Sequence, residues 1–266
     1  MISIICPLYN SENHLDKLID SLLEQKGVSE TIEIIFIDDG SNDQTLLTLI
    51  PKTKLLEKKY STVKILKQKH KGPGAARNYG IKESTYDYIA FLDSDDRWYE
   101  TKLQVCIDII KENKDMYNCY IHDEKYIRKN GESSIIENGI TKNESISRSL
   151  YLNNCLSTSA VIVKKSLIKK FQYFDENLQS SQDYDLWLKM APDLKIYKIK
   201  DILGEYIESS YSITSKYYIY RFLDQLFIAI RYRHYVSNLQ FLKKIIRIIL
   251  SKQWFFGLIK KNSHNY

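Results

Sequence analysis

Long hydrophobic runs are missing from this sequence, and glycine and proline are scarce. The apolar runs span only a few residues, far fewer than the ~20 that cross a membrane, so we expect no transmembrane helix. With 9 Gly and 4 Pro among 266 residues, long disordered linkers are not expected. The segment 1–6 lacks the basic stretch of a signal peptide and is typical of a strand. We therefore expect a cytoplasmic protein with one large domain, or a domain with an appendage.

Cysteine is also rare, and its spacing argues against two kinds of site. The four cysteines are widely separated, at Cys6, Cys106, Cys119 and Cys155. Without a Cys-x-x-Cys pair, the spacing supports neither a zinc site nor a disulfide framework. We expect reduced thiols, most of them small core residues.

Acidic residues are nearly absent from the carboxyl-terminal end. From Lys216 onward ten Lys and Arg accompany a single acid, Asp224. Residues 216–266 therefore carry a net charge of +9, which leaves −3 for residues 1–215 out of the total of +6. We expect an acidic-to-neutral body over 1–215 and a basic helical region over 216–266.

Strand-like and helix-like segments alternate through the first hundred residues. Short apolar runs predict strands at Ile2–Cys6, Ile32–Ile37, Val63–Leu66 and Tyr86–Leu92. Periodic apolar positions predict helices over 15–23, 46–55 and 75–82. This alternation indicates an α/β fold with a mostly parallel sheet covered by helices on both faces. In such sheets ligands bind where the strands end.

The strand that ends at Leu92 is followed by three carboxylates, Asp93, Asp95 and Asp96. Asp is a poor strand former and is costly to bury unpaired, so these residues are not expected in the core. Their oxygens suit Mg²⁺ or Mn²⁺, which could in turn hold a diphosphate. The alternative is a helix N-terminus, because a helical pattern begins near Trp98 and carboxylates favour that end. Taken alone, the segment is equally compatible with both.

Two further strand ends carry polar and acidic side chains, in segments 7–12 and 38–43. Helix capping accounts for Ser11 and Asn42, but not for the pair Asp38-Asp39, because one cap needs one acceptor. Three acid-bearing ends at one edge of a sheet predict a site. The Gly-Pro-Gly turn before Arg77 is a weaker signal; its glycines allow close backbone approach, and the arginine could neutralise a phosphate.

In this order, the segments resemble the inverting glycosyltransferases of family 2, which have the GT-A fold, a Rossmann-like nucleotide-binding fold. Six blocks match the family's order and spacing, at 3–10, 37–45, 74–78, 91–96, 173–178 and 182–188. Six ordered blocks are a strong signal where one would be weak. The resemblance implies a metal-dependent hexosyltransferase that uses a nucleotide-sugar, above all a UDP-sugar. The sequence lacks the Gln-x-x-Arg-Trp signature of processive synthases, which favours addition of a single sugar.

The resemblance also implies a nucleotide pocket lined by Pro7, Tyr9, Glu12 and Asp38. Tyr9 would stack on the base, and Asp38 would accept a base N–H. Arg77 would close the nucleotide side.

At the strand end, the resemblance implies that Asp93 and Ser94 bind the nucleotide-sugar. Asp95 would be the direct ligand of Mn²⁺ or Mg²⁺, with Asp96 close by. The metal would stabilise the charge of the departing nucleoside diphosphate.

For catalysis, the resemblance implies that Asp183 is the general base for the acceptor hydroxyl. Asp185 is the alternative base. Trp187 offers a flat face for a sugar ring, although a core tryptophan is the commoner case. The family usually has Glu-Asp where this chain has Gln182-Asp183, so a neighbouring like charge is lost.

A second departure follows Tyr206, where relatives often carry an Arg and a His. In this chain residues 207–210 are Ile-Glu-Ser-Ser instead. The contact that the Arg and His would make to the metal or a phosphate is therefore missing, or another residue supplies it. His122 is a candidate substitute; the commoner interpretation is an ordinary, partly exposed histidine.

The basic region predicts amphipathic helices. In 241–250 the apolar Leu242, Ile245, Ile246 and Ile249 share one face, opposite Lys243, Lys244 and Arg247. The aromatic Trp254, Phe255 and Phe256 follow. Such helices suit an anionic membrane surface; the alternative is that the apolar face packs on the body. We expect peripheral binding to the inner face of the cell membrane, and no nucleic-acid partner, because no recognition fold surrounds the basic residues.

A membrane contact would fit a glycan or lipid-linked glycan acceptor in the assembly of bacterial surface polysaccharide or oligosaccharide. One rival is a non-catalytic, nucleotide-binding, membrane-associated scaffold of the same fold, which Gln182 and the missing Arg and His favour. Another is a haloacid-dehalogenase-type phosphohydrolase with Asp93 as nucleophile. In that family the Asp-x-Asp motif follows the first strand, whereas here it follows the fourth, so we discount this rival.

Overall fold

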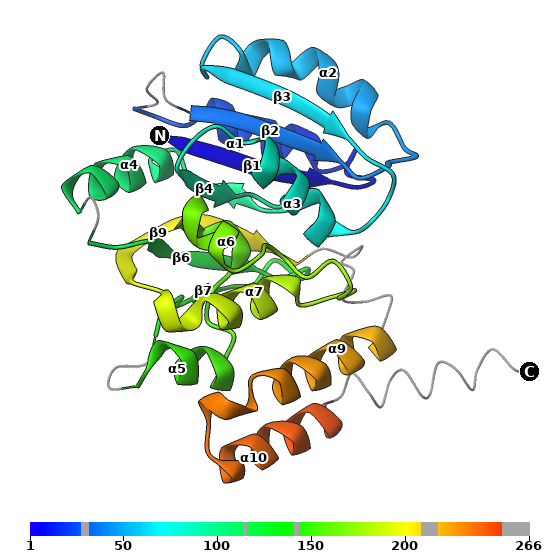
Figure 1. The fold of residues 1–266 in the computed structure, drawn as a ribbon. Coiled ribbons are helices and arrows are strands. Elements are labelled where there is room, and N and C mark those ends of the chain that lie inside the picture. Colours follow the sequence, from blue (N-terminus) through cyan, green and yellow to red (C-terminus); the bar gives the residue numbers. More distant parts are fainter. Residues whose placement is uncertain (28–31, 114–115, 141–143, 209–217, 252–266) are drawn as a thin grey trace, which may run out of the picture.

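The computed structural model describes residues 1–27, 32–113, 116–140, 144–208 and 218–251 (Figure 1). Its amino-terminal half contains four parallel strands, β1 (Ile2–Leu8), β2 (Ile32–Asp38), β3 (Thr62–Lys67) and β4 (Tyr88–Phe91). The helices between them are α1 (Leu15–Leu23), α2 (Thr45–Leu56) and α3 (Pro73–Glu83). Since β1, β2 and β4 are almost entirely buried, their apolar runs are continuous rather than alternating. The predicted α/β fold is confirmed.

The second half extends the same sheet with pairs that are antiparallel, except that β6 and β9 run parallel. Its strands are β5 (Arg97–Trp98), β6 (Cys119–Ile127), β7 (Ser133–Ile136), β8 (Val161–Lys164) and β9 (Ile196–Ile207). The strand order is β3-β2-β1-β4-β8-β6-β9-β5, with β7 paired to β6. The helices of this half are α4 (Lys102–Glu112), α5 (Ile146–Leu152), α6 (Lys165–Lys170) and α7 (Gln182–Met190).

Two hydrophobic clusters fill the space on either side of the sheet. Successive strand residues point to opposite faces, so Ile5 and Ile35 join one cluster while Ile4 and Ile34 join the other. Helices α3, α5, α6 and α7 cover the first cluster, and α1, α2 and α4 cover the second. All four cysteines are free thiols, three of them buried and Cys155 half-buried.

The three carboxylates after β4 do not lie at a helix N-terminus. Helix α4 begins only at Lys102, with Thr101 as its N-cap. Trp98, which begins the predicted helical pattern, belongs instead to β5 and pairs with Gly204 of β9. The helix-terminus interpretation of Asp93–Asp96 is therefore wrong.

The helix-capping interpretation of Ser11 and Asn42 is also wrong. The N-cap residues are His14 for α1 and Gln44 for α2. The Ser11 hydroxyl instead bonds the hydroxyl of Ser94, 3.1 Å away, and so joins two strand ends.

Helices α9 (Tyr218–Arg231) and α10 (Asn238–Ile249) run side by side at one end of the molecule, next to α5 and α7 (Figure 1). Ile228, Ala229 and Tyr232 are buried against the body. No helix among the described residues is long and apolar enough to cross a membrane. The aromatic residues Trp254, Phe255 and Phe256 lie outside the described residues.

The apolar face of α10 points away from the body, which contradicts the alternative in which it packs there. Leu242, Ile246 and Ile249 are exposed. Lys244 instead faces inward, where its Nζ donates to the carbonyl of Tyr151 and to the hydroxyl of Tyr184. The inward contacts of this helix are thus partly polar. Ile248 is buried and Ile245 half-buried, whereas Leu242, Ile246 and Ile249 remain on the surface.

Candidate functional site

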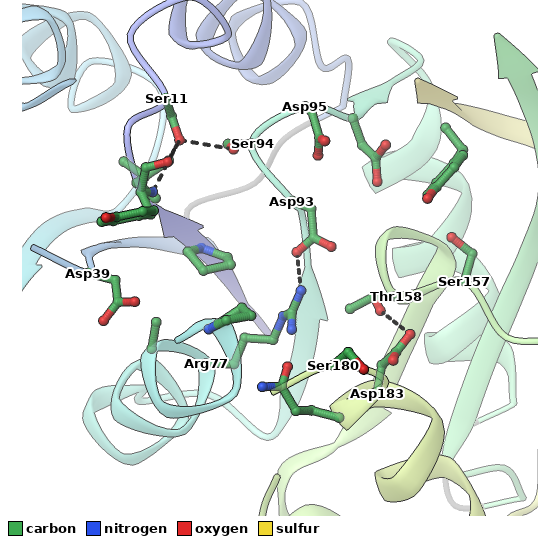
Figure 2. A pocket seen from close by; sticks show the side chains of 18 of the residues that line it. Ser11, Asp39, Arg77, Asp93, Ser94, Asp95, Ser157, Thr158, Ser180 and Asp183 are labelled. Carbon is green, nitrogen blue, oxygen red and sulfur yellow. Dashed lines mark hydrogen bonds and ion pairs between the residues drawn. The ribbon is translucent and has the colours of Figure 1, made fainter. Parts of the chain in front are cut away.

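A pocket with a volume of about 500 Å³ lies at the carboxyl-terminal edge of the parallel strands. All three acid-bearing strand ends contribute to its lining, through residues 7–11, Asp39 and residues 93–96. The opposite wall comes from residues 154, 156–158 and 179–183. In Figure 2, Ser11 and Asp39 lie on one side, Thr158 and Asp183 on the other, and Arg77 with Asp93 between them. The predicted convergence of strand ends is confirmed.

The wall next to β1 and β2 is organised by Asp39. Its carboxylate accepts hydrogen bonds from the backbone N–H groups of Lys71 and Gly72, both 2.8 Å long, and lies 2.8 Å from Nδ1 of His70. The His70 ring stacks on Tyr9 with ring centroids 4.0 Å apart. Tyr9 and His70 therefore form an aromatic step on the pocket wall, suited to stacking against a planar group.

Asp38 and Glu12, both predicted to line this wall, do not. Asp38 is buried at the end of β2 and accepts a hydrogen bond from Ser41 N–H, 3.3 Å away. Its neighbour Asp39, one residue beyond the strand, faces the pocket instead. Glu12 accepts from the backbone N–H of Gln44 at 2.9 Å and so ties the β1–α1 loop to the start of α2. Pro7 does line the pocket.

Arg77 reaches the floor of the pocket from α3. Its guanidinium lies 2.5 Å from the carboxylate of Asp93 and 5.6 Å from the ring centroid of Phe174. Burial by itself would lower the pKa of Arg77, but the attraction of Asp93 and the hydrogen bond to it, together with the charges of Asp183 and Asp95, raise this pKa, so the side chain is fully charged. The ion pair satisfies much of the charge of Asp93.

Asp96 is the innermost of the three carboxylates. It is buried and accepts hydrogen bonds from the hydroxyl of Ser159 at 2.6 Å and from the N–H of Ile207 at 3.2 Å. Burial, and then the like charge of Asp95, raises the pKa of Asp96 well above its usual range. Asp95 lines the pocket itself, where burial and then Asp93 raise its pKa.

This donor set fits Mg²⁺ or Mn²⁺ only as a site shared with a phosphate ligand. No group of three or more His, Cys, Asp or Glu among the described residues is arranged to hold a metal alone. Nucleotide-bound Mg²⁺, however, commonly takes one or two protein carboxylates and completes its shell with phosphate oxygens and water. The raised pKa values of Asp95 and Asp96 agree with such a site, because closely spaced carboxylates favour a neutralising cation.

Asp183 faces the carboxylates from the first turn of α7 (Figure 2). The hydroxyl of Thr158 donates to its Oδ2 at 3.1 Å and orients the carboxylate. Gln182 is buried; its amide donates to the carbonyl of Leu178 at 2.7 Å. A Cβ at Gly74 would lie 3.3 Å from the Gln182 side chain, so this glycine lets α3 approach α7 closely.

Three other candidate residues lie behind the pocket and not in its lining. Asp185 is fully buried, and its carboxylate contacts Arg231 at 2.8 Å and the hydroxyl of Tyr232 at 3.0 Å. This ion pair holds α7 against α9, so Asp185 is not placed to act as a base. Trp187 is also fully buried, with its ring 6.3 Å from that of Phe91. Its proposed contact with a sugar ring is wrong.

His122 is neither a pocket residue nor a partly exposed one. It is buried within β6, with Nδ1 2.8 Å from the carbonyl of Asp123. Burial, and then the charge of Lys102, lowers the pKa of His122 well below its ordinary value. It does not replace the missing Arg and His contacts.

Sequence patterns did not point to most of the wall opposite β1. Its lining residues, from segments with no recognised motif, include Asn138, Asn154, Ser157, Thr158, Gln179 and Ser180. Only Gln179 and Ser180 could have been expected in the lining, because they lie just before the matched block that begins at Gln182-Asp183. His14, on the other side, lies one turn beyond the matched β1 segment.

Comparison with known proteins agrees with this geometry. The model of the family described as Glycosyl transferase family 2 matches residues 3–171. An uncharacterized glycosyltransferase of Rickettsia conorii is 32% identical over 198 residues, which cover 71% of this chain and 30% of that protein. The Escherichia coli UDP-Glc:alpha-D-GlcNAc-diphosphoundecaprenol beta-1,3-glucosyltransferase WfgD is 32% identical over 221 residues, 81% of this chain and 80% of its own. The chain thus spans about a third of the Rickettsia relative and four-fifths of the E. coli one.

Solved structures share the fold at lower identity. Staphylococcus aureus TarS 1–349, in complex with UDP-GlcNAc, superposes with a TM-score of 0.71 at 22% identity, over 93% of this chain and 71% of that one. A mannosyltransferase from Pyrobaculum calidifontis, in complex with GDP-Man and Mn²⁺, gives a TM-score of 0.69 at 13% identity, over 95% and 71% of the two chains. The GT-A fold expected from the sequence is confirmed.

Proposed function

The chain belongs to glycosyl transferase family 2, and on this premise we propose that it moves a single sugar from a nucleotide-sugar to a hydroxyl of a glycan acceptor. The observation that carries the proposal is the pairing of two walls across one pocket. An aromatic step and a carboxylate cluster form the donor wall, and a carboxylate oriented by Thr158 faces them from α7.

The donor is a UDP-sugar in this proposal. Tyr9 and His70 would pack against the uracil ring, and Arg77 would approach the diphosphate from below. Asp95 would hold Mn²⁺ or Mg²⁺, close to the buried Asp96 and to Asp93, which is paired with Arg77; when bound, the ion would stabilise the charge of the leaving diphosphate. Support for UDP comes from the names of two similar proteins, one a UDP-Glc transferase and one crystallised with UDP-GlcNAc.

Transfer would follow a single displacement with inversion at the anomeric carbon. Asp183 accepts the proton of the acceptor hydroxyl as its oxygen bonds to that carbon, and the bond from the carbon to the phosphate oxygen breaks. The neutral Gln182 beside it is held by the carbonyl of Leu178, so it does not compete for the proton.

The acceptor in this proposal is a lipid-linked glycan at the cytoplasmic face of the membrane, in the assembly of surface polysaccharide. The E. coli relative is named for a diphosphoundecaprenol acceptor, and a Bacillus subtilis relative for minor teichoic acid biosynthesis. The outward aliphatic face of α9 and α10, with Lys243 and Arg247 exposed beside it, would lie on the anionic membrane surface.

The test is calorimetric titration of UDP and GDP into the full chain, with Mn²⁺ and then with a chelator. We expect UDP binding that needs the metal and that Asp95→Ala abolishes. Asp20→Ala, an exposed carboxylate on α1, is the matched control and should bind as the wild type does.

Turnover separates an enzyme from a scaffold. In an enzyme, Asp183→Asn abolishes sugar transfer but still binds UDP. If the wild type binds neither nucleotide, the proposal fails; if it binds UDP and transfers no sugar from any UDP-sugar tested, the scaffold interpretation replaces it.

A further inference from the structure

The loop that leads into α7 is held by a residue of the carboxyl-terminal region. Asp224 of α9 accepts three hydrogen bonds on one carboxylate oxygen, Oδ2. The donors are the backbone N–H of Gln179 at 3.0 Å, the backbone N–H of Ser180 at 2.8 Å and the hydroxyl of Ser180 at 3.0 Å. Charge-assisted bonds to two successive backbone groups fix the course of the chain as well as the position of a side chain.

These bonds act on the wall that carries Asp183. Gln179 and Ser180 line the pocket, and Asp183 follows three residues after Ser180. Between them, Ser181 has a φ of 54°, a left-handed conformation that residues with a side chain rarely adopt. A turn of this kind persists where surrounding contacts impose it, and the bonds from Asp224 end at the residue immediately before it.

Helix α9 also holds the chain beyond the turn. Arg231 of α9 pairs with Asp185 at 2.8 Å, two residues after Asp183, and with Asp175 at 3.0 Å. Helix α9 therefore contacts the chain both before and after residues 181–183. This helix lies outside the segment that the family model matches.

Asp224 does not serve the general surface charge of its region. It is the single acid among the ten Lys and Arg of residues 216–266. Its carboxylate is directed at neutral donors of the loop before α7, which a basic residue cannot satisfy.

We propose that Asp224 is a positioning residue for the pocket wall that carries Asp183, and that α9 thereby sets the placement of Asp183 relative to the acceptor hydroxyl. This proposal rests on the proposed glycosyl transfer, because only that reaction gives Asp183 a proton to accept. It predicts that the carboxyl-terminal helices are part of the catalytic unit, although the donor wall does not depend on them.

The experiment compares the full-length wild type with Asp224→Ala, Asp224→Asn and, as a control on the same helix, Gln225→Ala. Hydrogen exchange of the free protein reports on the loop without any substrate. We expect exchange at Gln179 and Ser180 to accelerate about tenfold or more in Asp224→Ala, and less in Asp224→Asn, which keeps an acceptor oxygen. Gln225→Ala should exchange as the wild type does.

Kinetics with a UDP-sugar then separate positioning from general damage. In Asp224→Ala we expect kcat/KM for the acceptor to fall about tenfold or more, while the Kd for UDP stays within about twofold of the wild type. Partial recovery in Asp224→Asn would support the proposal. Unchanged exchange, unchanged acceptor kinetics, or an equal loss of UDP affinity would each overturn it. A wild type that transfers no sugar would refute the proposed function, whereas the exchange data would still decide whether Asp224 holds the loop.

Discussion

The guanidinium of Arg77 and the carboxylate of Asp93 form an ion pair 2.5 Å long, which joins α3 to the end of β4 at the floor of the pocket (Figure 2). Asp93 is therefore neutralised by the protein itself. Its neighbour Asp95 lines the same pocket, and in the proposed function it is the carboxylate that would bind a divalent cation. Two carboxylates two residues apart thus have different electrostatic partners.

Removing Arg77 should destabilise the fold as well as the site. Arg77 is buried, and Asp93 is only partly exposed, so Arg77→Met leaves a poorly solvated carboxylate unpaired. We expect the free energy of unfolding in urea to fall by about 2 kcal/mol, below the 3–5 kcal/mol of a fully buried pair. In the double variant Arg77→Met/Asp93→Asn we expect most of the lost stability to be recovered, because no unpaired charge is left. If the stability losses of the two single variants simply add in the double variant, the ion pair contributes nothing.

Ser159→Ala should weaken nucleotide binding from outside the pocket. The Ser159 hydroxyl donates to Asp96 at 2.6 Å and accepts from the N–H of Asp93 at 3.2 Å, so it fixes both ends of the carboxylate turn. We expect a loss of about 2 kcal/mol in stability and about tenfold in metal-dependent UDP affinity. Ser84→Ala is the matched control, since Ser84 is also buried and bonded, to the carbonyl of Ile81, but lies away from the pocket. An equal loss of UDP affinity in both variants would contradict the prediction.

The sequence allowed the parallel half of the fold and the position of its site to be predicted, because both depend on local patterns. Continuous apolar runs followed by Asp and Ser mark buried parallel strands and their ends. The start of α4 could not be found this way. Trp98 fits a helical pattern, but it pairs with Gly204, more than a hundred residues away, and that pairing is invisible to local periodicity.

Individual site residues were harder to predict than the site itself. Asp38 and Asp39 are chemically identical, and only the point at which β2 ends decides which one faces the pocket. Likewise, Trp187 and His122 are buried by helices and strands packed on them from distant parts of the chain. A motif predicts that chemistry gathers at a strand end, whereas long-range packing decides which member of a pair is exposed.

The two aspartates of α7 should respond differently to the same substitution. Asp185→Asn removes the charge from a fully buried carboxylate, whose partner Arg231 is half-buried and also pairs with Asp175; we therefore expect about 2 kcal/mol of lost stability in urea unfolding, less than for a fully buried pair. Asp183→Asn keeps its hydrogen bond from Thr158, so its stability should stay within about 0.5 kcal/mol of the wild type. Sugar transfer should vanish in Asp183→Asn with UDP binding intact. Retained transfer in that variant would remove Asp183 as the base.

The free energy of unfolding should increase at alkaline pH because of Lys244. Burial, and then the charge of Arg247, lowers the pKa of Lys244 from its ordinary 10.5 to about 8. Between these values the unfolded chain binds the proton and the folded chain does not, so stability increases as pH rises and is lost as pH falls through about 8. Between pH 7.5 and 9.5 we expect the wild type to gain about 1 kcal/mol more than Lys244→Met, after allowance for solvent screening. The Tyr151 carbonyl keeps its bond from Tyr184 in that variant, so equal pH dependence in both proteins would refute the assignment.

The outward face of the carboxyl-terminal helices should bind anionic membranes. Its exposed aliphatic and aromatic residues repeat every three or four positions, at Ile219, Leu223, Phe227 and Ile230 on α9 and at Leu239, Leu242, Ile246 and Ile249 on α10. A face of this extent is unusual for a surface that meets only water. We expect the full chain to bind vesicles that contain anionic phospholipid, to bind neutral vesicles less, and to lose affinity with added salt.

Substitution within this face decides between membrane contact and an incidental apolar surface. The double variant Leu242→Gln/Ile246→Gln removes two aliphatic side chains that would be partly buried in the membrane surface. We therefore expect the affinity for vesicles to fall about tenfold or more. Leu47→Gln on α2 removes a side chain that is 70% exposed on a different helix, and should bind vesicles as the wild type does. Because neither change reaches the pocket, UDP affinity should be the same in all three proteins. Equal vesicle binding by the double variant and the wild type would show that α10 does not carry the contact, and the acceptor would then have to reach the enzyme without its help.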